Sequence, residues 1–419
     1  MKKIKFLTMS LLALLMACFT ACENSENKYD VDHTAHIVGT WTYIGPNYAE
    51  ALVIKEDGSV LSTGVEDGEY WENVAGTIKI KDNVATMTFE DGDNAIGHID
   101  VVPGIAFSIY EEDGEEWTFN YCANDLADEV IGMWVCTYVS TNNEDFNIYQ
   151  DAEMAINTYK ADGKSIFTGF VVEANDYMAN VESTYKVIGD LMLESNPLGE
   201  GVFQYNAFRL TYSPNSNQLG DILTKTSVMA FGDEVIEFNA SMLRVKESLN
   251  FTGQTYDYSA AHVSNAKGKD EDFTILGHTF NIANITGGNF DMLFRSELFY
   301  IDLNANSIKQ YYRLDNGQNI EIEIPITVDG NKVTLDMSNE HSAYRKVDIY
   351  MFQSANDSQL HMYMHTDAFI NYFANMELYN LLSVGKINPD DTAAIAKVFA
   401  DMEARIESIN VSMVFKARK

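Results

Sequence analysis

The chain has 419 residues, of which 46% are hydrophobic, 12% are aromatic and only 6 are proline. This length exceeds one ordinary domain, and the composition is that of a globular chain rather than a disordered one. With 62 acidic against 28 basic residues, the formal net charge is −34. A surface this acidic repels phosphate backbones and anionic lipid headgroups, so nucleic acid is excluded as an expected partner.

Residues 1–21 have the organisation of a lipoprotein signal peptide. A basic start precedes an apolar stretch, Phe6–Met16, that is too short to span a membrane. The segment ends at two cysteines that each follow an alanine, Cys18 and Cys22, and both resemble the lipobox at which bacteria lipidate a cysteine. We expect lipidation at Cys22, with Cys18 as the alternative, because a polar tether (residues 22–36) follows Cys22 directly. An ordinary cleaved signal peptide is the competing interpretation.

The end of this segment, FTAC followed by acidic residues, resembles surface lipoproteins of the Bacteroides group. The resemblance implies a location in the bacterial cell envelope, at the outer membrane. Acyl chains on the cysteine would hold the protein to a membrane face without a spanning helix.

A ten-residue pattern occurs twice, as KEDGSVLSTG in residues 55–64 and as KADGKSIFTG in residues 160–169. Each copy follows a Gly-x-Trp sequence, and a looser third series begins near residue 275. The residues at the glycine and aromatic positions are Gly39 and Trp41, Gly132 and Trp134, and Gly277 and Phe280. Self-similarity in the same order predicts three related units.

Each unit has the pattern of antiparallel β-structure. Asp-Gly turns permit the positive φ angles of tight hairpins, and apolar residues alternate with polar ones in stretches such as residues 76–89 and 325–337. The predicted fold class is therefore all-β, with tandem antiparallel meander barrels, since closure removes exposed strand edges.

The Gly-x-Trp sequences resemble the lipocalin and calycin family, including lipocalin-like lipoproteins of unassigned function. In that family the first-strand tryptophan closes one end of an up-and-down barrel and a late-strand arginine packs over it. The resemblance implies that Arg244 packs over Trp134 in the second unit. Phe415 stands at the arginine position of the third unit, and the first unit has no arginine there.

The expected domains are barrels at residues 37–128, 129–248 and 273–419, with a linker at residues 249–272. The third unit is expected to carry a helical hairpin before its last strand, with helices at about 367–382 and 389–408. Asn388 and Pro389 are typical of a helix start. An apolar stripe at helical spacing then includes Ile395, Val398, Phe399, Met402 and Ile406.

The sequence contains no hydrolase, metalloprotease or phosphate-binding motif, so we expect no enzymatic activity and no cofactor. His361, His365 and Asp367 are weak candidates for metal ligands, because residues four apart in a strand share a face. The alternative is an ordinary solvated strand surface.

Two other pairs of residues have more than one interpretation. Tyr70 and Trp71 are the best candidates for aromatic side chains that contact a ligand, and packing across a hairpin is their alternative. Cys122 and Cys136 lie 14 residues apart in an exported chain, so they form either a disulfide or two free thiols.

Taken together, these patterns predict a membrane-anchored, non-enzymatic binding protein for a small apolar ligand or a glycan. The ligand would lie in a barrel cup or between barrels. The alternatives are a structural or adhesive surface module with filled barrels and, less favoured, a hydrolase.

Overall fold

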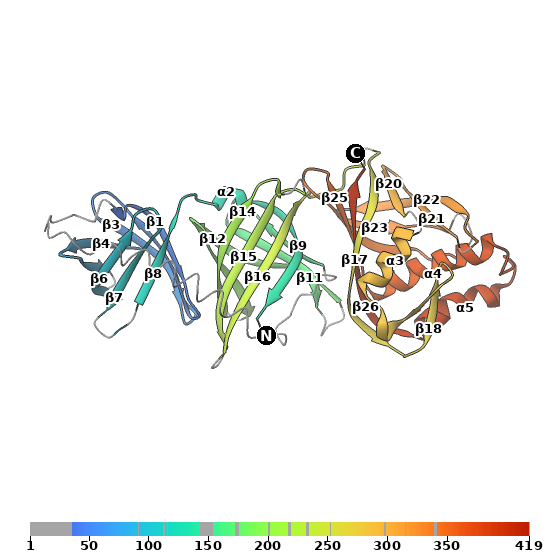
Figure 1. The fold of residues 1–419 in the computed structure, drawn as a ribbon, viewed down its shortest axis with the longest axis horizontal. Helices are drawn as coiled ribbons and strands as arrows, with labels where there is room; N and C mark the ends of the chain where they lie inside the picture. The colour runs from blue at the N-terminus through green and yellow to red at the C-terminus, as the bar shows by residue number, and fades with distance from the viewer. Residues whose placement is uncertain are drawn as a thin grey trace, which may run out of the picture.

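The chain forms three closed antiparallel β-barrels of eight strands each, which follow one another in chain order along the long axis of the molecule (Figure 1). The all-β prediction of tandem meander barrels is confirmed. The computed structural model describes residues 36–418 apart from 91, 112, 113, 115, 143–153, 172–175, 200, 201, 217, 218, 232, 233, 252, 297, 298, 315 and 339–341.

The first barrel closes by pairing of its first strand with its last. Its strands are β1 (Gly39–Ile44), β2 (Tyr48–Ile54), β3 (Ser59–Glu66), β4 (Glu69–Lys81), β5 (Val84–Phe89), β6 (Asn94–Val102), β7 (Ala106–Glu111) and β8 (Glu116–Cys122). Alternate residues of these strands fill the interior, as Leu52 and Ile54 of β2 do. Period-two alternation thus produces one buried face for each strand.

The second barrel follows a short helix, α2 (Ala127–Val130), and closes by pairing of β16 with β9. Its strands are β9 (Gly132–Thr141), β10 (Ala155–Tyr159), β11 (Lys164–Val171), β12 (Asp176–Ile188), β13 (Leu191–Gly199), β14 (Val202–Ser213), β15 (Ile222–Phe231) and β16 (Glu234–Val245).

The repeated ten-residue pattern forms the same hairpin turn in both of these barrels. Asp57 accepts a hydrogen bond from the Ser59 amide at 2.9 Å, and Asp162 accepts one from the Lys164 amide at 3.2 Å. The following glycines have φ angles of +79° and +80° at residues 58 and 163. The shared residues therefore encode turn geometry, because this φ region favours glycine.

The third barrel starts earlier in the chain than the sequence predicted. Its first strand is β17 (Thr255–Gly268), which pairs with the last strand, β26, and lies within the predicted linker. The other strands are β20 (Tyr300–Asn304), β21 (Ser307–Arg313), β22 (Asn319–Asp329), β23 (Lys332–Leu335), β24 (Val347–Gln353), β25 (Gln359–Met364) and β26 (Ile406–Ala417). The linker prediction is wrong for residues 255–268, which form a barrel wall.

The third aromatic position is also placed differently. Gly277 and Phe280 lie in or beside a separate two-stranded sheet, β18 (Asp272–Ile275) with β19 (His278–Asn281), and not in a barrel strand. Phe280 stacks on Phe290 with ring centres 5.6 Å apart. The predicted barrel-closing role of Gly277 and Phe280 is therefore wrong, because these residues pack outside the barrel strands.

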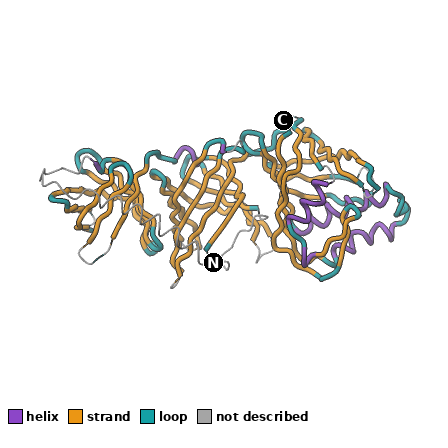
Figure 2. The backbone as a smooth tube through the Cα atoms, in the orientation of Figure 1, coloured by secondary structure: helices purple, strands orange, loops and turns teal. Residues whose placement is uncertain are grey.

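Helices gather at the third barrel (Figure 2). A 3₁₀ turn (Ile282–Asn284) and α3 (Gly287–Ser296) precede β20, and the hairpin of α4 (Thr366–Ser383) and α5 (Thr392–Glu403) lies between β25 and β26. The hairpin before the last strand is confirmed, but its second helix ends at Glu403. Ile406, assigned to the helical stripe by the sequence, begins β26, and Asp391 rather than Asn388 caps α5 by accepting the Ala394 amide.

Helix α4 is buried on nearly all sides, and its apolar residues do not form a single stripe. Its Tyr372 hydroxyl accepts a hydrogen bond of 2.8 Å from Gln310 of β21, which is 1% exposed. A helix that is apolar all round belongs in a core. Helix α4 thus packs against the inward face of the third barrel and helps to fill it.

Adjacent barrels contact one another through packed side chains. Between the first and second barrels, Ala49 and Ala51 of β2 cluster with Leu191 and Leu193 of β13. Between the second and third barrels, Val135 and Leu243 cluster with Phe352 and Tyr363 among others. These clusters bury apolar outer faces of the barrel walls.

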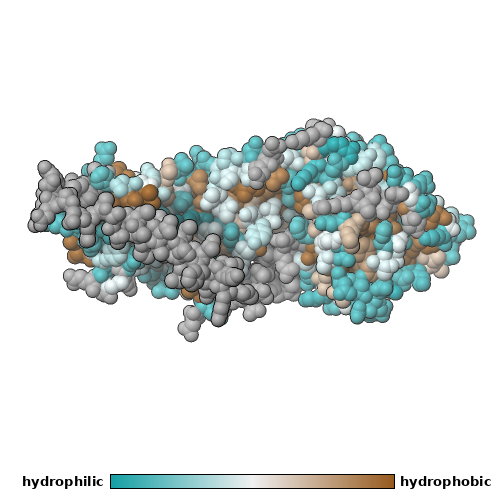
Figure 3. All heavy atoms as spheres, in the orientation of Figure 1, coloured by the Kyte–Doolittle hydropathy of each residue, from teal (hydrophilic) through white to brown (hydrophobic). Residues whose placement is uncertain are grey.

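The outer surface carries both polar and apolar residues. On the face drawn in Figure 3, hydrophilic residues cover much of the outer part of the third barrel, and hydrophobic residues appear as separate patches. Within the described chain, no helix has the length and apolarity needed to cross a membrane.

Candidate functional site

Matching tryptophans close one end of each of the first two barrels. The indole Nε1 of Trp41 donates to the Ile37 carbonyl at 2.7 Å, and that of Trp134 donates to the Val130 carbonyl at the same distance. Both rings are fully buried. Each tryptophan thus ties the first strand to the segment four residues before it.

Arg244 covers the tryptophan of the second barrel. Its guanidinium lies 4.6 Å from the centre of the Trp134 ring and donates to the Glu129 carbonyl at the end of α2. In the first barrel Tyr121 holds the same register position, because it pairs with Trp41 as Arg244 pairs with Trp134. The Tyr121 and Trp41 rings pack edge to face, 5.0 Å apart.

In the third barrel two aromatic residues form the corresponding pair. Phe415 of β26 pairs with Tyr258 of β17, and their rings pack edge to face at 5.9 Å. Phe415 is the residue that the sequence aligned with Arg244. In all three barrels, a side chain of the last strand therefore packs on an aromatic ring of the first strand at this position.

Side chains fill the barrel interiors. In the second barrel Lys225 and Glu194 form a buried ion pair at 2.6 Å, and the Tyr159 hydroxyl donates to Glu194 at 2.7 Å. The Lys225 ammonium also lies 3.8 Å from the centre of the Phe208 ring. Burial and the adjacent Glu194 carboxylate raise the pKa of Tyr159 well above its usual value. This network spans the barrel between β10, β13 and β15, so the middle of the barrel is occupied.

The first barrel holds a buried acid inside its other end. Glu50 is 5% exposed and accepts hydrogen bonds from Ser62 at 2.5 Å and from Tyr48 at 2.6 Å. Trp71 donates to the Ser62 hydroxyl at 2.7 Å. Burial, outweighing these hydrogen bonds, raises the pKa of Glu50 to about 7. The network therefore places four hydrogen-bonded side chains inside this end of the barrel.

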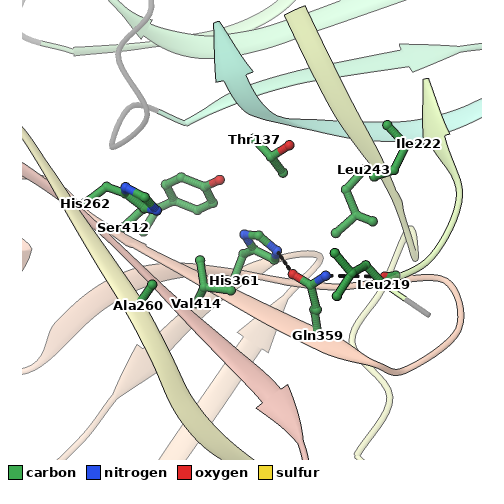
Figure 4. Close-up of a pocket in the computed structure, with 11 residues that line it drawn as sticks. Thr137, Leu219, Ile222, Leu243, Ala260, His262, Gln359, His361, Ser412 and Val414 are labelled. Carbon is green, nitrogen blue, oxygen red and sulfur yellow. Dashed lines mark hydrogen bonds between the residues drawn. The ribbon is translucent and has the colours of Figure 1, made fainter. Parts of the chain in front are cut away.

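The main candidate site is a pocket of about 230 Å³ between the second and third barrels (Figure 4). The second barrel contributes the apolar side chains of Leu219, Ile222 and Leu243, together with Thr137. The third barrel contributes the outward faces of β17, β25 and β26. The pocket therefore combines an apolar side with a polar wall, as small-molecule sites usually do.

Strand pairing organises the polar wall into rows. In the first row His361 pairs with Val414, which pairs with Ala260, and in the second row Ser412 pairs with both Tyr363 and His262. All six side chains line the pocket. Because residues two apart in a strand share a face, each row is roughly 7 Å from the next.

His361 is held as a neutral acceptor. Its side chain is 4% exposed, and its Nε2 lies 3.0 Å from the Gln359 side-chain oxygen, whose amide nitrogen in turn donates to the Leu219 carbonyl at 3.5 Å. Burial, and secondly the nearby His262, lower the pKa of His361 to about 4. Since Nε2 donates to Gln359, the other ring nitrogen is the hydrogen-bond acceptor at neutral pH.

The three metal-ligand candidates are not brought together. His361 lies in β25, whereas His365 is the residue at the start of α4 and Asp367 lies in the first turn of that helix. The strand ends at Met364, so the expected shared face does not exist. Among the described residues, no group of three or more His, Cys, Asp or Glu side chains is arranged to hold a metal ion.

Tyr70 and Trp71 take part in packing between and within barrels. The Tyr70 ring stacks on Tyr205 of the second barrel at 5.2 Å with an interplanar angle of 6°. Beside them, Lys186 forms an ion pair with Glu72 at 2.5 Å. Trp71 covers Gly64 and joins the Glu50 network. Both aromatic side chains therefore already have partners within the chain.

Cys122 and Cys136 are free thiols. Cys122 ends β8 and donates to Asp190 at 2.9 Å across the junction of the first two barrels, whereas Cys136 packs in the core of the second barrel. Because the two side chains belong to different environments, no disulfide joins them. Cys18 and Cys22, the lipidation candidates, lie outside the described residues.

Sequence reasoning missed most of the pocket. Of its residues, only His361 was a candidate, while His262, Gln359 and Ser412 were not considered. A detectable signal existed in β26, where the polar residues Ser408, Asn410 and Ser412 alternate with buried apolar ones. Polar residues that alternate in a strand normally indicate a solvated face, so the pattern alone does not indicate a binding wall.

Comparisons with known proteins show distant likeness only. No protein-family model and no curated protein matches the chain. Among solved structures, a mutant of transferrin binding protein B from Haemophilus parasuis Hp5 is similar at 9% identity over 89% of this chain, with a TM-score of 0.24. The protein of that name from Neisseria meningitidis serogroup B is similar at 7% identity over 89%, with a TM-score of 0.21.

A third structure, a putative outer membrane protein from Bacteroides fragilis NCTC 9343, is similar at 11% identity. The match covers 70% of this chain and 100% of that protein, with a TM-score of 0.16. The chain spans 66% of the length of each transferrin binding protein. All three TM-scores are below 0.5, so the likenesses are distant.

Proposed function

We propose that the chain is a lipid-anchored, non-enzymatic binding protein of the bacterial cell envelope, at the outer membrane. Its ligand is a small uncharged molecule that occupies the pocket between the second and third barrels. The anchor is supported by the lipobox-like sequence at Cys22 and by the polar tether after it.

The observation that carries the binding function is the lining of this pocket. It joins apolar side chains of one barrel to His361, Ser412 and other polar groups of the next. None of the described residues that line it is Asp, Glu, Lys or Arg. A site without a fixed charge suits a neutral ligand, since burial of an unpaired charge is costly.

The filled barrels favour one rival, a structural or adhesive module. The Lys225–Glu194 pair, the Glu50 network and α4 occupy space that a cup-shaped barrel would leave open. This observation disfavours the barrel interiors as the ligand site and supports the junction between the second and third barrels.

Native mass spectrometry of the lipid-anchored protein purified from its own host tests the proposal. The spectrum is recorded before and after organic extraction, and we expect an extractable mass beyond the acyl anchor. Ala260→Phe, which fills the pocket wall, should remove that mass. Ala396→Phe, at an exposed alanine of α5, is the matched control and should retain it. Protein plus anchor alone in every sample would favour the structural module.

The anchor has a separate test. Cys22→Ala should release the protein from the membrane fraction and prevent incorporation of labelled palmitate, whereas Cys18→Ala should retain both. The reverse pattern would assign lipidation to Cys18. If the unsubstituted chain incorporated no labelled palmitate, the anchor would be contradicted.

A further inference from the structure

The polar wall continues beyond the pocket into a third row. Ser264 of β17 pairs with Asn410 of β26, directly after the row of His262 and Ser412. No register shift occurs between Ala260 and Ser264, so these side chains share the face that lines the pocket. The row therefore extends the wall by roughly 7 Å.

The two side chains of this third row are buried with unused hydrogen-bonding capacity. Ser264 is 4% exposed and Asn410 is 3% exposed. Within the described structure, the Ser264 hydroxyl oxygen and the Asn410 amide nitrogen have no hydrogen-bond partner. Such groups are rare in native proteins, and each indicates a missing partner such as a ligand or water.

The next polar residue on this face of β26 does have a hydrogen-bond partner. The Ser408 hydroxyl, one position further along β26, donates to the Asn265 carbonyl at 2.8 Å. Burial on this face therefore does not in itself prevent a hydroxyl from finding a partner. Six other buried side-chain atoms of the described chain also lack a hydrogen-bond partner, but Ser264 and Asn410 are the two that are paired across adjacent strands next to the pocket.

We propose that Ser264 and Asn410 form a polar subsite that continues the pocket, and that the ligand is a neutral glycoside. Its sugar hydroxyls bind along the rows of His262, Ser412, Ser264 and Asn410, and its apolar group lies against Leu219, Ile222 and Leu243. This inference rests on the proposed binding function and specifies the ligand class.

The chemistry of the wall favours hydroxyl groups over other polar groups. The Asn410 amide nitrogen requires an acceptor, the His361 ring nitrogen requires a donor, and the Ser264 hydroxyl takes either role. A sugar hydroxyl both donates and accepts, so one type of group meets all three needs. An anion has no hydrogen to donate to the His361 ring nitrogen. It is also repelled by a chain with a formal net charge of −34.

The test uses the lipid-anchored full chain in phospholipid nanodiscs, with empty nanodiscs as the blank. Titration calorimetry compares phenol with the phenyl glycosides of glucose, galactose, mannose and N-acetylglucosamine, and with phenyl glucuronide. We expect at least one neutral glycoside to bind at least tenfold more tightly than phenol, and phenyl glucuronide to bind no better than phenol. Ala260→Phe should abolish binding of all the probes.

The variants Ser264→Ala and Asn410→Leu test whether these two residues bind the sugar. Each should weaken the best glycoside about tenfold, the size of one lost hydrogen bond, and leave phenol unchanged. Each should also raise the melting temperature of the ligand-free protein, because it removes an unpaired buried polar group. Ser408→Ala is the matched control and should not change glycoside affinity.

The outcomes separate the two proposals. If phenol binds and Ala260→Phe blocks it, but no glycoside gains affinity or the subsite variants have no effect, the glycoside inference is overturned and the binding function stands. If no probe binds and the protein from its host carries no extractable mass, both proposals fail.

Discussion

Arg244 lies over the face of Trp134 at 4.6 Å and also donates to the Glu129 carbonyl, so one side chain joins β16, β9 and the end of α2. The Arg244 carbonyl accepts from the Ala355 amide of the third barrel at 3.0 Å. The closed end of the second barrel is thus continuous with its junction to the third.

Arg244→Ala should destabilise the second barrel by about 2–3 kcal/mol, the sum of a cation–π contact and a charged hydrogen bond. Arg244→Lys should cost less, about 1 kcal/mol, because it keeps the charge but loses the planar contact with the ring. Hydrogen exchange of peptides from β9 and β16 provides the measurement. Equal exchange in all three proteins would show that the contact does not stabilise the barrel.

The buried ion pair of the second barrel should respond unequally to single and double changes. Lys225→Met leaves Glu194 buried without its cation, which should cost about 3–5 kcal/mol. Adding Glu194→Gln removes the unpaired charge and keeps an acceptor for the Tyr159 hydroxyl, so most of the stability should return. Urea unfolding measures both variants. A double variant as unstable as Lys225→Met would show that packing, not charge, sets the cost.

The sequence predicted the first two barrels because their signals are local. Gly-x-Trp and the Asp-Gly turns depend on residues within a few positions of each other, and both units repeat them. The sequence of β17 predicts a linker because the tract is polar, and a bulge between Tyr258 and Ala260 also interrupts its alternation. One of its polar outer residues, His262, lines the pocket opposite side chains of the second barrel, a contact that the sequence does not reveal.

The pocket was not predictable for a related reason. Its walls come from strands as far apart in the chain as β9 and β26, and no local motif connects Thr137 with Ser412. By contrast, the pairing of Trp134 with Arg244 followed from the family resemblance, which specifies two strands. In the first barrel the same position is occupied by a tyrosine, so a search for arginine alone could not find it.

Glu50→Gln should remove a pH dependence from the first barrel. The pKa of Glu50 is raised from 4.5 to about 7, so the folded chain keeps a proton that the unfolded chain loses. Stability therefore falls as pH rises from 4.5 through 7 and then levels off. The glutamine variant should lack this fall and gain up to about 3 kcal/mol at pH 8. Urea unfolding of both proteins at pH 4, 6 and 8 tests this. If the free energy of unfolding changed with pH by the same amount in both, the prediction would be contradicted.

His361 should produce the opposite dependence. Its pKa is lowered from 6.5 to about 4, so the unfolded chain binds the proton first as pH falls. The stability associated with neutral His361 is present above pH 6.5 and is lost between 6.5 and 4. His361→Gln should reduce this acid-induced loss, measured as the change in melting temperature between pH 7 and pH 4.5. An unchanged acid response would show that His361 is not the titrating group.

Cys122 should be unreactive in the folded protein and should not pair with Cys136. Burial, and secondly its hydrogen bond to Asp190, raise the pKa of the Cys122 thiol to about 11. At pH 8 its thiolate fraction is then on the order of 0.1%, roughly a hundredfold below that of an ordinary thiol. The single-thiol variant Cys136→Ser should therefore react with iodoacetamide about a hundredfold more slowly than the unfolded chain. Asp190→Asn removes the carboxylate that the thiol donates to, so it should restore part of the reactivity.

Pairing of Cys122 with Cys136 has its own test. Diamide treatment of the native chain, followed by intact-mass measurement, should leave both thiols reduced. A mass loss of two hydrogens that requires both cysteines would contradict this expectation. It would mean that the first and second barrels separate where Thr42 donates to Asp190 at 2.6 Å, beside Cys122.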